Sequence, residues 1–400
     1  QNRAREKRYQ KQGLTGKIAR ERCARAADGS PADKEKLSAL LLQAEEILNQ
    51  CKKEPLIKNK DVYVELLYVT VLNTPRYREE YIIAETGEIF SEHEDNFVIK
   101  GSQELFDTGE SRNPATIMQL YSMVVLIHAE DGRRKEAEDL LERAKRYAGN
   151  ARNSMVYALY YNLLANYYDI LLDGFYNTED PDEKLLLDQM LDAVERALRY
   201  SKKAIPSDGN HLYAVNTLAK ATILMRSGRG SAREINRLLE QARKIIMKNT
   251  SPYADVRLQY DLVCGWYAAL IRNNVEEAEV YVQKAQELSE MIIPASLRKI
   301  EEVIIPCANM FFELGCYEKA MKLLYEGTRL CAKHANVDSY ARIRQDLCNY
   351  FWQVGIEAQA FDRCRKMIQI IDCENNDIVD PRNRVVIPDE VRDLMAGGTN

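Results

Sequence analysis

The chain has 400 residues, of which 46% are hydrophobic and 29% charged, and its formal net charge is −5 at pH 7. This length and apolar content suffice for a core larger than one compact domain usually holds. No run of about 18 uninterrupted apolar residues occurs, so we expect no membrane-spanning helix. Nine cysteines, an odd number without a CxxC pair, argue against a disulfide framework and favour a reducing, cytoplasmic location.

Residues 1–32 are predicted to form a basic N-terminal arm or linker. Residues 1–25 carry nine Lys and Arg against Glu6 and Glu21, a net of +7, which leaves −12 for residues 26–400. Such an arm can bind nucleic acid or an acidic surface. A solvated helix, or a linker from an upstream domain, is the commoner explanation, because no aromatic or groove-reading motif accompanies the charges. The arm has no apolar segment typical of a signal peptide, and since the chain starts at Gln1 we expect a piece of a longer protein.

Two segments precede the main helical region. Residues 33–75 are predicted to hold two helices, at 33–53 and 61–73, that extend or cap that region. Residues 76–111 are acidic, with ten Asp and Glu against three Lys and Arg. There, YIIAETGEIF alternates apolar residues around Thr86–Gly87, and NFVIKG follows. This pattern predicts a small β-hairpin insertion with a possible third strand.

Residues 112–373 repeat one helical pattern, in which a small residue is followed four positions later by a larger apolar one and three later by a small one. The clear copies are Ala137/Leu141/Ala144, Ala197/Ser201/Ala204, Ala278/Val282/Ala285 and Ala320/Leu324/Gly327, and the weaker ones are Ile235/Leu239/Ala242 and Ala360/Cys364/Met367. Positions i, i+4 and i+7 share one helix face, so each copy is a packing surface. Another amphipathic helix precedes each copy, and Gly132, Gly315 and Gly355 are predicted to make three of the turns between them. The pattern therefore predicts an all-α region of about six helix pairs.

The Gly turn, the Ala-x-x-x-large-x-x-Ala second helix and the first-helix aromatics Tyr168, Phe311 and Phe351 resemble the tetratricopeptide repeat. Repeats of that family are about 34 residues long, whereas most spacings here are roughly 40. In this they are similar to the sensor arms of bacterial signalling proteins, including peptide-responsive regulators and signal-transduction ATPases. The resemblance implies a right-handed α-α superhelix, a TPR-like solenoid from which the β-hairpin projects. Residues 374–400 are predicted to form a polar tail with one short helix near 389–395.

The sequence offers little for catalysis or metal binding. Its four histidines form neither an HExxH motif nor an i, i+4 pair. Seven of the nine cysteines lie between Cys264 and Cys373, but their spacings match no zinc motif, and Cys307, Cys348 and Cys364 fall on packing positions of the repeat. We therefore expect no enzyme, no catalytic residue, no metal and no cofactor.

In stacked helix pairs the first helices line an inner groove. One stripe of each is predicted to face it: Asn162, Asn166, Asp169, Tyr213, Asn216, Lys220, Tyr260, Tyr267, Asn309, Arg342, Gln345, Asn349 and Trp352. A side-chain amide can pair with the N–H and C=O of an extended peptide, and Tyr and Trp supply apolar walls. In peptide-binding members of the family, inward Asn residues bind the ligand backbone and Lys or Arg bind carboxylates. The resemblance therefore implies these roles for Asn166, Asn309, Asn349, Lys220 and Arg342. The alternative is that such residues only keep the groove solvated.

These patterns favour a non-catalytic scaffold that binds an extended peptide or protein segment in its groove, as an adaptor or signal sensor. The alternative is a ligand-sensing or oligomerisation arm of a larger bacterial transcription regulator or signal-transduction ATPase. A nucleic-acid-binding helical repeat is disfavoured by the net −12 over residues 26–400. The expected partner is thus a protein or peptide, with no membrane, and with nucleic acid only through the basic arm.

Overall fold

The computed structural model of the chain describes residues 114–130, 132–173, 176, 178–205, 210–248, 254–292, 299–336 and 338–396. The basic arm at 1–32, the helices predicted at 33–75 and the β-hairpin predicted at 76–111 lie outside these residues. The described residues form thirteen α-helices with short π- and 3₁₀-helical turns, and no strand occurs among them. The all-α prediction is therefore confirmed for this part of the chain.

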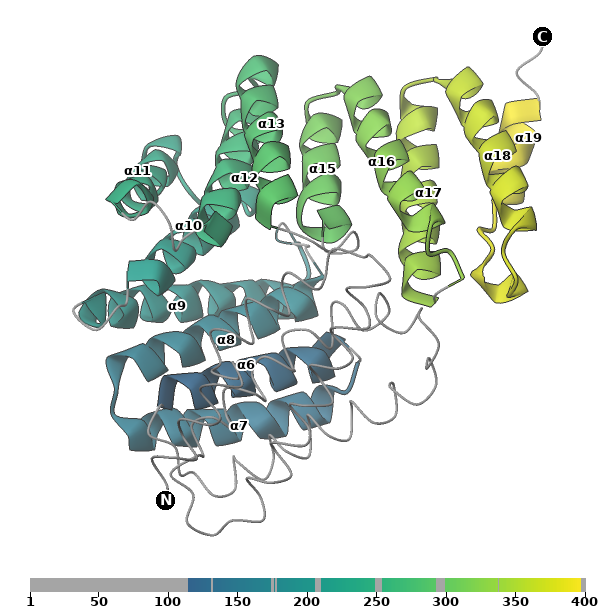
Figure 1. Cartoon of the computed structure of the whole chain (residues 1–400). Helices are drawn as coiled ribbons and strands as arrows, with labels where there is room; N and C mark the ends of the chain where they lie inside the picture. Colours follow the sequence, from purple (N-terminus) through teal and green to yellow (C-terminus); the bar gives the residue numbers. More distant parts are fainter. Residues whose placement is uncertain are drawn as a thin grey trace, which may run out of the picture. The chain divides into compact units, whose positions relative to one another are not determined.

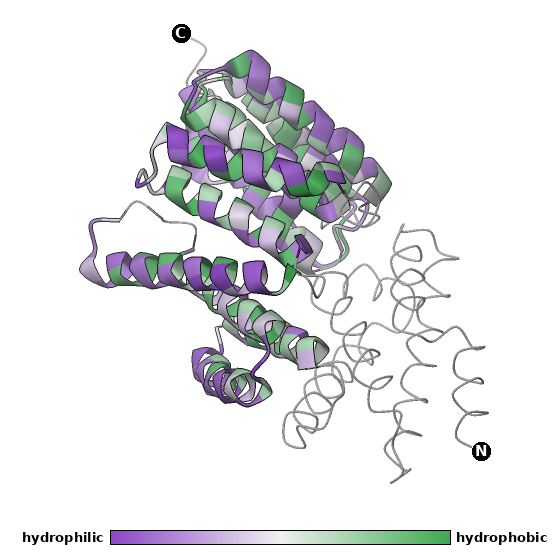
Figure 2. Cartoon of the chain, turned by 90° about the vertical axis from the view of Figure 1, so that its left-hand side faces the viewer, coloured by the Kyte–Doolittle hydropathy of each residue, from purple (hydrophilic) through white to green (hydrophobic). Residues whose placement is uncertain are grey.

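Hydrophobic and hydrophilic residues alternate along the helices in Figure 2, as expected of amphipathic helices that bury one face. Among the helices of the described ranges, none combines the length and the apolar character that crossing a bilayer requires.

The chain divides into two compact units whose boundary lies within α12, between Tyr260 and Asp261. The helices of the first unit are α6 (Pro114–Glu130), α7 (Arg134–Ala151), α8 (Ser154–Leu172), α9 (Pro181–Lys203), α10 (Asn210–Arg226) and α11 (Ala232–Lys248), followed by the start of α12 (Ala254–Leu270). Packing between successive helices runs from α6 to α11, and α6 also packs on α8 (Figure 1). The core of α6, α7 and α8 includes Ile117, Tyr121, Leu141 and Leu163.

The second unit continues from the end of α12. It contains α13 (Val275–Ile292), the π-helical turn η2 (Ile300–Ile304), α15 (Ile305–Glu313), α16 (Tyr317–Ala332), α17 (Asp338–Glu357), α18 (Phe361–Asn376), the 3₁₀ turn η3 (Pro381–Asn383) and α19 (Asp389–Ala396). Figure 1 shows α15 to α18 side by side, with the short α19 against α18.

A left-handed residue follows the first helix of every pair. These residues are Gly132, Asp173, Gly228, Asn273, Gly315 and Gln359, all with positive φ, after α6, α8, α10, α12, α15 and α17. After α6, for example, the N–H of Arg133 donates to the carbonyl of His128 at 2.8 Å, and after α15 that of Cys316 donates to Phe311 at 2.8 Å. This hydrogen bond across six residues satisfies a carbonyl that the helix end would otherwise leave unpaired. A left-handed residue thus follows all six first helices, and the same hydrogen bond is made after five of them; after α8, the N–H of Asp173 donates to the carbonyl of Ile170 at 3.2 Å.

The repeated packing faces of the second helices are buried as predicted. All residues of the six sequence copies are buried except Ala360, the residue before α18, which is half-buried. Alanine at these positions lets the paired helix approach closely, because no bulk separates the two backbones.

The turn predicted at Gly355 is wrong. Gly355 lies inside α17, and the reversal occurs at Gln359, whose φ is 53°. The structure gives another reason for glycine there. A Cβ at Gly355 would stand 2.3 Å from Cys364 Sγ and 3.2 Å from Met321 Cε. Gly355 therefore permits the close approach of α18 to α17, rather than the end of the helix.

Replacing Gly355 should separate the effect of packing from that of helix propensity. Gly355→Ala should lower the free energy of unfolding by about 1–3 kcal/mol, because Cys364 must move to admit the methyl group. Gly149→Ala is the matched control: Gly149 also lies in a helix, α7, and a Cβ there meets nothing within 4 Å. That change should raise stability by roughly 0.5–1 kcal/mol. Urea unfolding measures both, and equal effects would contradict the packing role of Gly355.

Candidate functional site

Three predicted groove residues of the first unit form a row of amides. Asn162 Nδ2 donates to Asn216 Oδ1 at 2.7 Å, and Asn166 Nδ2 donates to Asn162 Oδ1 at 3.3 Å. The row joins α8 to α10 and runs from the exposed Asn166 to the fully buried Asn216. The prediction that Asn216 faces an open groove is therefore wrong. Its amide lies in the packed surface between the two first helices and helps to hold them together.

The other predicted residues of the first unit differ in their surroundings. Asp169 accepts a hydrogen bond from the buried Tyr176 hydroxyl. Burial, with the nearby Asp169 carboxylate, raises the pKa of Tyr176, so this hydroxyl remains a donor. Lys220 is ion-paired with Glu195 at 3.0 Å, and Tyr213 and Tyr260 are half-buried. Asp169 and Lys220 are thus already engaged within the fold.

In the second unit, the predicted groove positions of Tyr267 and Trp352 are wrong. Trp352 is only 2% exposed and Tyr267 is also buried, whereas Arg342 and Asn349 are exposed and Asn309 and Gln345 are half-buried. The ring of Trp352 meets that of Phe351 edge-on, with 5.5 Å between centroids. A first helix packs on neighbours along much of its circumference, so only a narrow stripe stays accessible and residues at its edge turn into the core.

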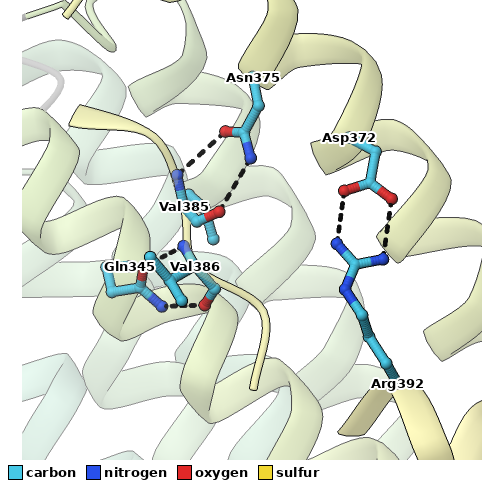
Figure 3. Close-up of polar contacts among 6 residues, drawn as sticks. All are labelled: Gln345, Asp372, Asn375, Val385, Val386 and Arg392. Atoms are coloured by element: carbon cyan, nitrogen blue, oxygen red, sulfur yellow. Dashed lines mark hydrogen bonds and ion pairs between the residues drawn. The ribbon is translucent and has the colours of Figure 1, made fainter. Parts of the chain in front are cut away.

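Gln345 contacts a part of the chain that the sequence does not place beside it. Residues 378–388, here called the C-terminal strap, run past the ends of α17 and α18. Gln345 Nε2 donates to the carbonyl of Val386 at 2.9 Å, and Gln345 Oε1 accepts from the N–H of Val386 at 2.7 Å (Figure 3). One side-chain amide therefore satisfies both backbone groups of one strap residue.

Asn375 does the same for the preceding strap residue. Its Nδ2 donates to the carbonyl of Val385 at 2.8 Å, and its Oδ1 accepts from the N–H of Val385 at 3.0 Å. Gln345 belongs to α17 and Asn375 to α18. We call these two residues the amide clamp. The clamp thus pairs with the backbone groups of two consecutive strap residues.

Further contacts fix the strap on either side of the clamp. At its start, the N–H of Val379 donates to Asn336 Oδ1 at 2.8 Å. Beyond its end, Arg392 of α19 binds both carboxylate oxygens of Asp372, at 2.7 and 3.1 Å (Figure 3). In the turn between Val379 and α19, hydrogen bonds from Arg382 lower the pKa of Asp380 to about 2. The Asp380 carboxylate therefore stays charged at physiological pH.

A buried ion pair lies next to the clamp in the sequence. Arg344, whose side chain is 0% exposed, donates from its guanidinium to the Glu374 carboxylate, which is one-third exposed. These residues directly precede Gln345 and Asn375. Because a buried guanidinium needs its counter-charge, the pair opposes any slip of α17 along α18. It therefore helps to set the spacing of the two clamp amides.

The sequence reasoning missed Asn375 and the strap. Asn375 lies at the end of a second helix, outside the stripe assigned to the groove, and its partner follows ten residues later. One local signal was available: in Val385–Val386–Ile387, apolar residues stand two positions apart inside a polar segment. This spacing is typical of extended chain that buries one side.

A separate hollow of about 470 Å³ opens between α16 and α18. Met321, Phe351 and Met367 lie in it, and the side chains of Lys322 and Lys366 stand at the same hollow from the two helices. It combines an apolar lining with positive charge, and none of its lining residues belongs to the clamp.

The described ranges were also searched for side chains that could hold a metal ion. Among these residues, no three His, Cys, Asp or Glu side chains converge as metal ligands would. Cys307, Cys348 and Cys364 are fully buried in the packing surfaces, as their positions in the repeat predicted. Comparison with known protein families and with curated proteins gives no match for this chain.

Thiol chemistry should reflect this packing. Burial raises the pKa of Cys307 and of Cys348 to about 12, so both stay protonated and unreactive at pH 8. Cys373 is exposed. Iodoacetamide at pH 8, followed by peptide mass spectrometry, should label Cys373 at least tenfold faster than either buried thiol. Equal labelling of all three in the folded protein would contradict the burial described here.

The buried ion pair should matter far more than exposed ones. Glu374→Gln leaves the Arg344 charge buried without its counter-charge and should destabilise the fold by at least about 2 kcal/mol. Glu318→Gln is the matched control, because Glu318 is 80% exposed and pairs with Arg363 at 3.2 Å. Its removal should cost less than about 1 kcal/mol. If urea unfolding gave equal losses, the ion pair could not be what fixes α17 on α18.

Proposed function

We propose that the chain is a non-catalytic, tetratricopeptide-like scaffold that binds an extended segment of a partner protein or peptide. The observation that carries the proposal is the amide clamp, in which Gln345 and Asn375 each pair with both backbone groups of an extended residue. Gln345 is also one of the residues predicted from the sequence to face the peptide-binding groove.

Main-chain pairing suits a binding scaffold because it does not depend on the sequence of the bound segment. When an extended peptide binds a protein, its backbone hydrogen bonds supply affinity and alternate side chains supply specificity. The clamp supplies four such bonds. Six successive helix pairs, each reversed at the same left-handed position, also support a superhelical scaffold of the kind that binds partners along its surface.

The test uses a fluorescent peptide that copies residues 381–391, PRNRVVIPDEV. In the intact chain the strap occupies the same amides. Removing the amides there would weaken the strap and the competing peptide together, and the two effects on peptide affinity would cancel. The full-length background therefore carries Val385→Asp and Ile387→Asp, which keep the strap off the site. In that background, Gln345→Ala with Asn375→Ala should weaken peptide binding more than tenfold, because four hydrogen bonds of about 0.5–1.5 kcal/mol each are lost.

Gln353→Ala with Gln369→Ala is the matched control, since both glutamines are exposed on the same two helices. It should leave binding within twofold. Fluorescence anisotropy reads out all three proteins. Absence of saturable binding in the background, or equal binding with and without the clamp amides, would refute the proposed function.

A further inference from the structure

The strap binds its site in the manner of a separate peptide ligand. Val385 and Ile387 are 4% and 6% exposed, whereas Val386 between them is 71% exposed. This alternation is that of extended chain with one side buried. The clamp holds the backbone of Val385 and Val386, and the unit buries the two side chains that stand two residues apart.

The same contacts define what else the site accepts. The clamp contacts no strap side chain through its four hydrogen bonds, so it does not select a sequence. Selection falls to the two buried positions, which require apolar side chains of about the size of Val and Ile, while the position between them is free to vary.

We propose that this site takes an extended peptide of the pattern apolar–any–apolar, and that the chain's own strap occupies it until such a peptide displaces the strap. This inference rests on the proposed function and adds to it the ligand class and its regulation. The strap is a tethered competitor. Its local concentration is high and independent of protein concentration, so an external peptide binds only the fraction of molecules whose strap has left the site.

The form of the contact permits release. The strap is joined to the unit by hydrogen bonds and apolar contacts, and its far end is held by α19, a helix of eight residues, through the Arg392–Asp372 pair. Arg392 and Asp372 are each nearly half-exposed, so a partner or solvent reaches this pair without entering the core. Release of α19 therefore frees the far end of the strap and weakens the hold of the strap on the clamp.

The experiment compares adjacent positions that receive the same substitution in the full chain. Val385→Asp places a charge at a buried strap position and Val386→Asp places one at an exposed position, with identical changes in net charge. The labelled peptide that copies residues 381–391 should bind Val385→Asp at least tenfold tighter than wild type and Val386→Asp within twofold of wild type. Arg392→Glu breaks the exposed ion pair with Asp372 and should also tighten peptide binding. This variant replaces Val385→Asp in the test if Val385→Asp lowers the helicity of the chain.

The ligand class is tested with two altered peptides on the Val385→Asp chain. Aspartate at the peptide position copied from Val385 should weaken binding at least tenfold, and aspartate at the position copied from Val386 should not. Equal affinity of the original peptide for wild type, Val385→Asp and Arg392→Glu would overturn the tethered competitor. Equal affinity of the two altered peptides would overturn the ligand class. If no chain binds the original peptide, the proposed function itself fails, and this inference with it.

Discussion

The contact between α17 and α18 is the constraint on which the candidate site depends. Arg344 and Glu374 form an ion pair within this contact, with the guanidinium wholly buried. Gly355 lets α18 approach α17 closely, because any side chain there would meet Cys364. Moving the buried Arg344 charge away from its partner costs free energy. At Gly355 the two helices are in direct van der Waals contact, so separating them would open a gap in the packing. Together they hold two helix ends at a fixed distance and register.

The relative position of Gln345 and Asn375 is fixed by the same contact, since each residue directly follows a member of the ion pair in the sequence. Two amides from different helices can serve consecutive residues of one extended segment only if their separation matches the rise of that segment, about 3.3 Å per residue. The helix pair thus acts as a rigid frame, and the amides make bonds that a strand would otherwise make with a neighbouring strand. This explains how two helices hold a segment of extended chain.

Local patterns were sufficient to predict the helices and the repeat. Small and apolar residues at i, i+4 and i+7 report a helix face whatever surrounds it, and residues such as Ala137, Ala278 and Leu324 are buried accordingly. Glycine marks only three of the six left-handed turns, because Asp173, Asn273 and Gln359 adopt the same conformation. Gly355 misled the turn assignment, since glycine also serves close packing.

The site was predictable only in part, because it depends on contacts between distant residues. Gln345 was placed on the stripe predicted to face the groove, from its position on the helix, but the backbone-binding role was assigned to Asn166, Asn309 and Asn349 instead. Trp352, three residues after Asn349, was assigned to the same stripe, but the packing of neighbouring helices buries it. Asn375 could not be found without knowing that the chain turns at η3 and returns. Polar residues on a helix suggest a binding face, while the choice among them is made by tertiary packing.

The central claim is that two side-chain amides hold extended backbone, and amide hydrogen exchange at single residues tests it most directly. The N–H groups of Val385 and Val386 donate to Asn375 and Gln345, so both should exchange slowly in the folded protein. In the chain with Gln345→Ala and Asn375→Ala, both should exchange at the rate of an unstructured peptide while the helices stay protected. Fast exchange of Val385 and Val386 in the wild-type chain, or protection that survives the loss of both amides, would contradict the account.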